Sequence, residues 1–196
     1  MILKRFYVLL LLAVCFSCQE DFIPKPKAFL RLEYPTPKYS ASHLEPLPFT
    51  FETNALAAPI TLKLLHAPTQ TYGLNIDYPT LNGTVFLTYK AVNENNTNLE
   101  NFIQDAQKLT LEHTKKADEI PAYPYENAER KVYGLFSEVI GNVASPAQFY
   151  ITDSINHFLT ASLYFNTKPN YDSILPAANY LQNDMKHIME TIKWKE

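Results

Sequence analysis

The order of strand-like and helical segments is the feature of this sequence that most restricts its fold. Short runs rich in apolar, aromatic and β-branched residues are separated by turn signals such as Asn82-Gly83, and such runs predict strands. The predicted strands are 49–53, 60–66, 72–78, 84–90, 131–140, 148–152 and 155–165. One amphipathic segment divides them into two groups and another closes the chain. Because the connections are short, we predict an α+β fold: a single domain with a mainly antiparallel sheet packed by two helices.

Both helices are predicted from apolar residues that recur every three or four positions. The first begins with a capping box, Thr97 with Glu100, and ends at Pro121, because proline cannot continue a helix. The second begins near residues 172–173 and accepts Pro176 in its first turn. A long strand followed by this C-terminal helix resembles the arrangement in PsbP-like domains, a likeness of fold that implies no function.

The N-terminus has the composition of a cleaved export signal, residues 1–17. Two basic residues precede an apolar run, residues 6–16, which is too short to cross a bilayer, since a spanning helix needs about 20 apolar residues. Ser17 is small, and Cys18 is followed at once by polar and acidic residues. This resembles a bacterial lipobox, in which the cysteine is acylated with chains such as palmitate and becomes the new N-terminus. The alternative is an ordinary secretory signal cut near Ser17, which leaves Cys18 as a free thiol.

The exported chain must be stabilised by a hydrophobic core, because it offers no pair of cysteines. Cys15 leaves with the signal and Cys18 becomes the anchor, so no thiol remains for a disulfide, a nucleophile or a zinc site. The 179 residues from Cys18 onward suffice for one domain. They contain 15 basic and 20 acidic residues, a net charge of −5 without a long basic stretch, which argues against nucleic acid as a partner.

Proline marks a tether between the anchor and the domain. Six prolines lie between residues 22 and 48, and each fixes φ and removes a backbone donor, so segment 18–48 is predicted to run extended. Within it, residues 28–34 alternate apolar and charged side chains, a pattern that favours pairing at a sheet edge. The globular domain is accordingly predicted to occupy residues 49–196.

The sequence contains no recognised catalytic or cofactor motif. Its five histidines are not spaced as metal ligands, and the chain lacks a nucleophile elbow, a P-loop and a dinucleotide fingerprint. We therefore assign no catalytic residue, no metal and no cofactor. His113, on the apolar stripe of the first helix, and His157, in phase with apolar residues of the last strand, are interpreted as core histidines with satisfied ring nitrogens. The alternative is that one of them is a ligand or an acid–base group.

Two serines are candidate modification sites. Asp153-Ser154-Ile155 and Asp172-Ser173-Ile174 each resemble the Asp-Ser/Thr-aliphatic acceptor of a bacterial O-glycosylation system for exported proteins. Turn and helix-cap chemistry also explains Asp and Ser at both places. For Ser154 both interpretations stand, whereas for Ser173 the cap is favoured.

Several long stretches carry a family resemblance. They are IPKPKAFLRLEYP (23–35), LNIDYP (74–79), GTVFLTYK (83–90), DAQKLTLEHTKKADEIP (105–121) and the C-terminal block 141–194, which contains GNVASPAQFYITDSINHFLTASLYFNTKPNYDSILPAANYL and ends in METIKW. These stretches, which extend over essentially the whole exported chain, are similar to the GldD family of gliding motility lipoproteins. The resemblance implies an envelope lipoprotein required for gliding and linked to type IX secretion, and it transfers only the acylated Cys18 as a site.

Two functional hypotheses follow. The first is a non-enzymatic lipoprotein that contacts other gliding-motility and type IX secretion proteins of the envelope. The alternative is an envelope enzyme or glycan-binding lipoprotein with a pocket near His113 or His157. Gln19 does not resemble the aspartate that retains lipoproteins at the inner membrane, so we predict the outer membrane and leave its periplasmic or surface face open.

Overall fold

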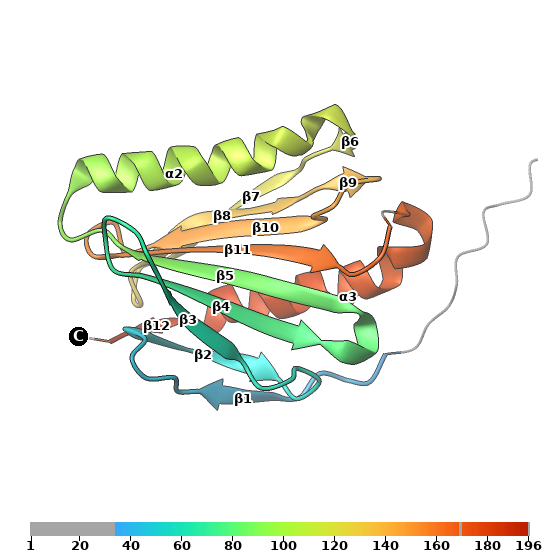
Figure 1. Cartoon of the computed structure of the whole chain (residues 1–196), viewed down its shortest axis with the longest axis horizontal. Coiled ribbons are helices and arrows are strands. Elements are labelled where there is room, and N and C mark those ends of the chain that lie inside the picture. The colour runs from blue at the N-terminus through green and yellow to red at the C-terminus, as the bar shows by residue number, and fades with distance from the viewer. Residues whose placement is uncertain (1–33, 169, 196) are drawn as a thin grey trace, which may run out of the picture.

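A seven-stranded antiparallel sheet forms the centre of the fold (Figure 1). The structure, a computed structural model, describes residues 34–168 and 170–195. Within them, the strand order across the sheet is β3-β4-β5-β11-β10-β8-β7. The strands are β3 (Thr61–Leu65), β4 (Thr71–Tyr78), β5 (Gly83–Ala91), β7 (Ala122–Asn127), β8 (Val132–Glu138), β10 (Ala147–Thr152) and β11 (His157–Phe165). With two α-helices packed on this sheet, the predicted α+β class is confirmed.

Two smaller sheets complete the strands. The first has the order β1-β2-β12, made of β1 (Tyr39–Ser42), β2 (Phe49–Asn54) and β12 (Lys193–Trp194). The second pairs β6 (Ala117–Glu119) with β9 (Ile140–Gly141). β1 lies inside segment 18–48, so this part of the predicted tether is paired with the domain. Residues 1–33, with the predicted signal, Cys18 and nearly all of the 28–34 segment, lie outside the described residues.

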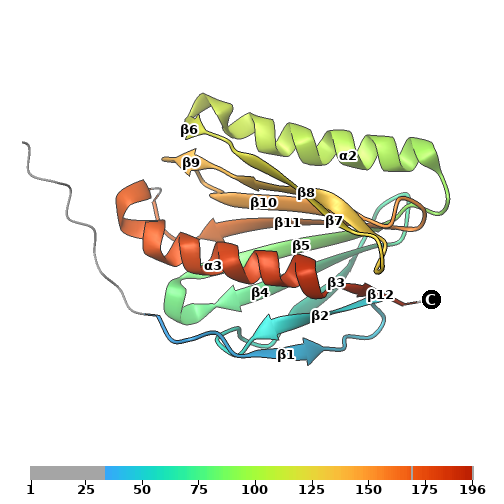
Figure 2. The ribbon, with the colours of Figure 1, turned by 180° about the vertical axis from the view of Figure 1, so that it is seen from behind.

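Helix α3 (Tyr171–Thr191) lies across one face of the large sheet, as Figure 2 shows. Its buried apolar side chains are Ala178, Leu181, Met185, Ile188 and Met189. All of these except Ala178 join one core cluster with alternate residues of the strands, for example Val85, Leu87 and Tyr89 of β5, and with Phe49 and Phe51 of β2. Each large apolar side chain buried here stabilises the fold by roughly 1.5–3 kcal/mol.

Helix α2 (Asn96–Leu111) lies on the opposite face, and its predicted start was wrong. The N-cap is Asn95, whose Oδ1 accepts the backbone N–H groups of Thr97 at 3.0 Å and Asn98 at 3.2 Å. Asparagine is among the best N-cap residues, so the capping box of Thr97 with Glu100 is not formed.

The predicted end of this helix at Pro121 was also wrong. The α-helix ends at Leu111 and continues as a 3₁₀ turn, η2 (Glu112–Lys115), followed by β6. Ala117 pairs with Gly141 of β9, so a strand pairing replaces the helical turn that the apolar periodicity indicated.

The second helix begins at Tyr171, next to the predicted 172–173. Its N-cap position is Asn170, and the backbone N–H of Tyr171 donates to Oδ1 of Asn142 at 2.9 Å. Pro176 lies in the second turn rather than the first. In the described ranges, no helix combines the length and apolarity needed to cross a membrane.

The turn at Asn82 explains why β4 and β5 pair in register. A 3₁₀ turn, η1 (Pro79–Leu81), leads to Asn82, which adopts φ 51°, a left-handed conformation that asparagine tolerates better than most residues. The chain then reverses, and Tyr78 pairs with Gly83.

Candidate functional site

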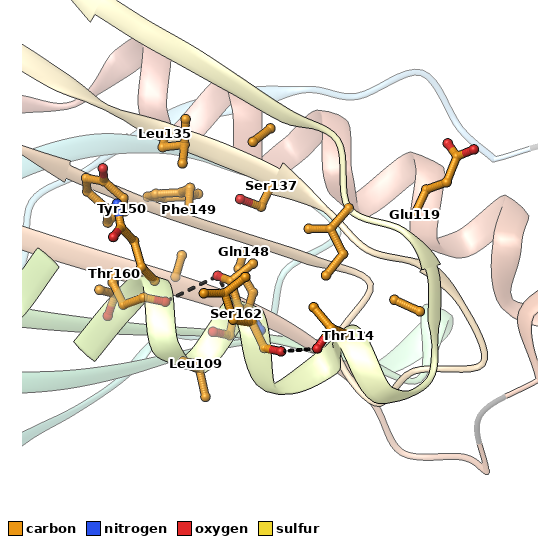
Figure 3. Close-up of a pocket in the computed structure, with 18 of the residues that line it drawn as sticks. Leu109, Thr114, Glu119, Leu135, Ser137, Gln148, Phe149, Tyr150, Thr160 and Ser162 are labelled. Carbon is orange, nitrogen blue, oxygen red and sulfur yellow. Dashed lines mark hydrogen bonds between the residues drawn. The ribbon is translucent and has the colours of Figure 1, made fainter. Parts of the chain in front are cut away.

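A pocket of about 490 Å³ lies between α2 and the large sheet (Figure 3). Apolar side chains line it from both sides, among them Ala106, Leu109, Leu111, Ile120, Ala122 and Leu135. This volume falls within the range of about 300–1,000 Å³ found for small-molecule sites, which are also mostly apolar.

The pocket exists because α2 does not pack closely on the sheet. No residue of α2 is buried, whereas α3 buries six. The apolar side chains of Leu109 and Leu111 remain 40% and 61% exposed. Near its start, α2 touches the sheet through Phe102, whose ring lies 5.6 Å from that of Phe158.

A polar side chain from the sheet connects to α2 where apolar packing is missing. Gln148 of β10 is only 4% exposed, and its Oε1 accepts the hydroxyl of Thr110 at 2.7 Å. Its Nε2 lies 2.9 Å from Nε2 of His113, which accepts this hydrogen bond when the ring is neutral. Burial lowers the pKa of His113, against an opposing effect of Glu112, and so favours that neutral form.

Two serine hydroxyls flank Gln148 on the floor of the pocket. Ser137 of β8 and Ser162 of β11 are both cross-strand neighbours of Gln148, and all three line the pocket. The two serines are 5% and 8% exposed, and neither hydroxyl has a hydrogen-bond partner within the described part of the chain. They are therefore free to bond to a ligand.

Both histidines singled out in the sequence have a bonded ring nitrogen, as predicted, but neither is a core residue. His113 lies in η2 rather than on the stripe of α2, and both side chains are half-buried. Nδ1 of His157 lies 2.9 Å from the hydroxyl of Tyr89, and its ring stacks on Trp194 at 4.9 Å. Burial lowers the pKa of His157, and Asp153 partly opposes this.

His157 and Trp194 also border a second, more polar cleft of about 610 Å³. Asp153 lies in the same cleft, but its Oδ1 accepts the backbone N–H groups of Ile155, Asn156 and His157 at 2.8–3.0 Å. Oδ1 of Asp153 and Nδ1 of His157 are thus bonded to other groups, and in the described residues no hydrogen bond joins the two side chains.

The two candidate glycosylation serines differ in the hydrogen bonding of their hydroxyls. Ser154 is exposed, and its hydroxyl has no hydrogen-bond partner in the described ranges. The hydroxyl of Ser173 donates to the carbonyl of Asn170 at 3.1 Å, so Ser173 is not the N-cap residue but bonds back to it. Cys18, the predicted lipidation site, lies outside the described residues.

Sequence reasoning missed a buried carboxylate on α3. Asp184 is 1% exposed, and its Oδ1 accepts the Tyr39 hydroxyl at 2.6 Å, while Nδ2 of Asn54 donates to both oxygens at 2.9 and 3.1 Å. Burial raises the pKa of Asp184, and the bonds from Tyr39 and Asn54 oppose this rise. The available signal was an acidic residue three positions after Leu181, on the apolar stripe of the helix.

Strand β3 forms a free edge of the large sheet and presents apolar side chains to solvent. Leu64 is 71% exposed and Leu65 41%, although both belong to an apolar, strand-forming run. On the same sheet, Phe86 of β5 is 40% exposed. Free edges and exposed apolar patches are features by which proteins bind other chains.

Within residues 34–168 and 170–195, no group of three or more His, Cys, Asp or Glu side chains is placed to hold a metal ion. A comparison with protein families identifies the kind of protein. The family model described as "Gliding motility lipoprotein GldD" matches residues 19–194. The chain belongs to the GldD family. It is therefore a gliding motility lipoprotein of the cell envelope. No curated protein and no solved structure matched, so the likeness of this GldD-family domain to PsbP-like domains stays a prediction.

Proposed function

We propose that this GldD-family protein is a non-enzymatic part of the gliding and type IX secretion apparatus and acts through protein–protein contacts. Acylated Cys18 holds it at the outer membrane, segment 18–48 connects the anchor to the domain, and residues 49–196 carry most of that domain. A membrane-held domain meets other membrane-held proteins at a high effective concentration, so a small interface suffices.

The free edge of β3 is the observation that carries this proposal. A partner strand that adds to this edge satisfies its outer backbone groups and covers Leu64, the most exposed large apolar side chain among the described residues. Leu65, the next residue in the strand, points to the opposite face of the sheet, so a strand added at this edge meets an exposed apolar side chain on each face. Solvent exposure of these side chains in the free protein is otherwise unfavourable.

Leu64→Lys tests the contact, because a charge at the centre of the edge opposes burial by a partner without disturbing the core. Crosslinking and pull-down from intact cells should lose partner proteins, and cells should stop gliding. Tyr123→Lys is the matched control, since Tyr123 is 48% exposed and lies on β7, the opposite edge strand of the same sheet. A Leu64→Lys strain with normal gliding and an unchanged crosslink pattern contradicts the proposal.

The non-enzymatic part of the proposal has its own test. Deletion of the protein should stop gliding and disturb the level or assembly of other motility proteins. Copies with His113→Gln or His157→Gln should restore gliding once folded and anchored. A folded, anchored variant that keeps its partners yet loses gliding would instead indicate catalysis.

Glycan binding is a second candidate function, favoured by the cleft at Trp194. Sugar rings stack on aromatic side chains, and the cleft adds hydrogen-bonding and charged groups from Arg130, Lys131, Lys193 and Asn156. Titration of polysaccharide fragments into wild-type protein and Trp194→Ala distinguishes this candidate, because stacking requires the indole. Equal binding by both proteins, or by neither, rejects it.

Ser154 is the better of the two proposed glycosylation sites. It adopts φ 69°, a left-handed conformation that costs a non-glycine residue about 1–2 kcal/mol. Turn chemistry favours glycine or asparagine at such a position, so it accounts for Asp153 but not for serine. An exposed hydroxyl at the tip of a tight turn is also open to a modifying enzyme.

A further inference from the structure

The pocket beneath α2 disfavours anionic ligands. Its lining contains two carboxylates, Asp118 and Glu119, and no Lys, Arg or His. A carboxylate or phosphate brought into this space meets like charge, without a cation in the lining to compensate. A ligand of this pocket is therefore uncharged, or carries its charge outside.

Two rows of side chains form the floor of the pocket, and only the first of them is polar throughout. Ser137, Gln148 and Ser162 are cross-strand neighbours on β8, β10 and β11, and the next row on the same face is Leu135, Tyr150 and Thr160. The rows are about 7 Å apart, because same-face residues are two positions apart along a strand. Figure 3 shows Glu119 on the side of Ser137, with Leu135 and Tyr150 on the other side.

This arrangement fits a molecule with one polar end and one apolar end. The hydroxyls of Ser137 and Ser162 have no partner in the described chain. They lie on either side of Gln148, two strand spacings or about 10 Å apart, so a neutral head that carries at least two hydrogen-bonding oxygens is needed to reach both. Beyond it, the apolar surfaces of Leu135 and Leu109 can enclose a hydrocarbon chain. Gln148 is not available to the ligand, because Thr110 and His113 already occupy its amide.

We propose that the pocket binds the single hydrocarbon chain of an uncharged amphiphile, such as a monoacylglycerol, with its neutral head between Ser137 and Ser162. Helix α2 is the lid of this site. Because α2 buries no residue of its own, a bound chain supplies the apolar contacts that its inner face lacks. The membrane beside an envelope lipoprotein is a source of such molecules, and this site is separate from the β3 edge.

Isothermal titration calorimetry tests the proposal on the full mature chain with Cys18→Ala, so that no acyl group of its own competes. The probes are 1-decanoylglycerol and decanoate, which share one chain length, each below its micelle concentration at pH 8. We expect saturable 1:1 binding of decanoylglycerol and about tenfold weaker binding of decanoate, from repulsion by Asp118 and Glu119. The double variant Asp118→Asn with Glu119→Gln should bring the affinities for decanoylglycerol and decanoate closer together.

Two threonines provide a matched pair of variants. Thr160 and Thr88 are directly opposite each other on β11 and β5, but only Thr160 lines the pocket. Thr160→Phe fills the space and should weaken decanoylglycerol binding at least about tenfold, whereas Thr88→Phe should not change it. If circular dichroism shows that Thr160→Phe does not fold, the nearly isosteric double variant Ser137→Ala with Ser162→Ala is used instead. We expect its affinity for decanoylglycerol to be several-fold lower than that of the wild type. Absent decanoylglycerol binding, equally tight decanoate binding, or full affinity in the pocket variant that folds overturns the proposal.

Discussion

The hydrogen bond between Tyr39 and Asp184 links β1, the first described strand, to α3, and Tyr39→Phe measures its strength. The variant keeps the ring, which stacks on His187 at 3.6 Å, and removes only the hydroxyl that donates to Asp184 at 2.6 Å. A hydrogen bond to a charged group contributes roughly 1.5–3 kcal/mol. Because Asn54 still donates to both carboxylate oxygens, the carboxylate is not left unpaired, and we expect a loss of about 2 kcal/mol in the free energy of unfolding.

The loss should depend on pH in a defined direction. Burial raises the pKa of Asp184 above its usual 3.8, and the Tyr39 hydroxyl opposes that rise, so its removal raises the pKa further. A carboxyl whose folded pKa lies above its unfolded pKa costs stability as pH rises from the unfolded to the folded value. The cost is larger in Tyr39→Phe, so its deficit should be greatest at pH 7 and shrink towards pH 4.

Urea unfolding followed by circular dichroism, at several pH values between 4 and 8, measures both effects. Tyr123→Phe is the control, because it removes the hydroxyl of a 48% exposed tyrosine and should change stability by less than about 0.5 kcal/mol. If Tyr39→Phe matches this control at pH 7, or if its deficit is the same at every pH, the hydroxyl does not stabilise a charged Asp184 and the reasoning fails.

Three further predictions concern single residues. Cys18→Ala should abolish labelling with acyl-chain analogues and release the protein from the membrane fraction. Unchanged labelling would show that Cys18 is not the acylated residue. Separately, recovery of the wild-type protein in the inner membrane rejects the proposed outer-membrane location. Ser154→Ala should remove any glycan mass detected on the native protein, while Ser173→Ala should leave it in place; the reverse result would assign the modification to the helix start. His157→Gln should lower the free energy of unfolding by about 1–3 kcal/mol at pH 7.5, because the Tyr89 hydroxyl loses its partner. A histidine with a lowered pKa makes the folded state less stable as pH falls below 6.5, so the variant should lose less stability than the wild type over that range. An equal decline in wild type and variant rules out that contribution.

The strands with regular alternation could be predicted from sequence almost to the residue. The predicted 84–90 is Gly83–Ala91 in the structure, because Val85, Leu87 and Tyr89 all point into the core and the turn at Asn82 fixes where the strand begins. Strand β7 gave no such signal. Its six residues AYPYEN include Pro124, and none is buried, because it pairs with β8 only at the edge of the sheet.

The end of the first helix could not be predicted, because its sequence is compatible with two structures. Ala117 and Ile120 continue the helical spacing of the apolar residues, yet Ala117 pairs with Gly141 and Ile120 lines the pocket. Gly141 adopts φ 126°, and a Cβ there would lie 2.9 Å from the carbonyl oxygen of Lys116. The close approach that this glycine permits is a long-range pairing, which periodicity within one segment does not report.

The pocket could not be predicted from the sequence either. Periodicity indicates which face of a helix points inward, but not how closely that face packs against the sheet. Both helices are amphipathic, and only α3 buries its stripe. The distance of α2 from the sheet depends on long-range contacts, and those of Gln148 with Thr110 and His113 are among them. Such contacts join residues 35 to 38 positions apart, and no pattern within either segment indicates them.

The two helices therefore contact different parts of the domain. The tether side is fixed to α3, since the Tyr180 hydroxyl donates to the carbonyl of Pro35 at 3.1 Å and Tyr39 donates to Asp184 one turn further along. These two contacts attach residues 35 and 39 to the helix that is packed into the core, where movement would expose apolar surface. Helix α2 lies on the other face, where Phe102 contacts Phe158 and Thr110 bonds to Gln148, and none of its residues belongs to the core cluster. The contacts that hold the N-terminal residues of the domain and the proposed lipid pocket therefore lie on opposite faces of the sheet.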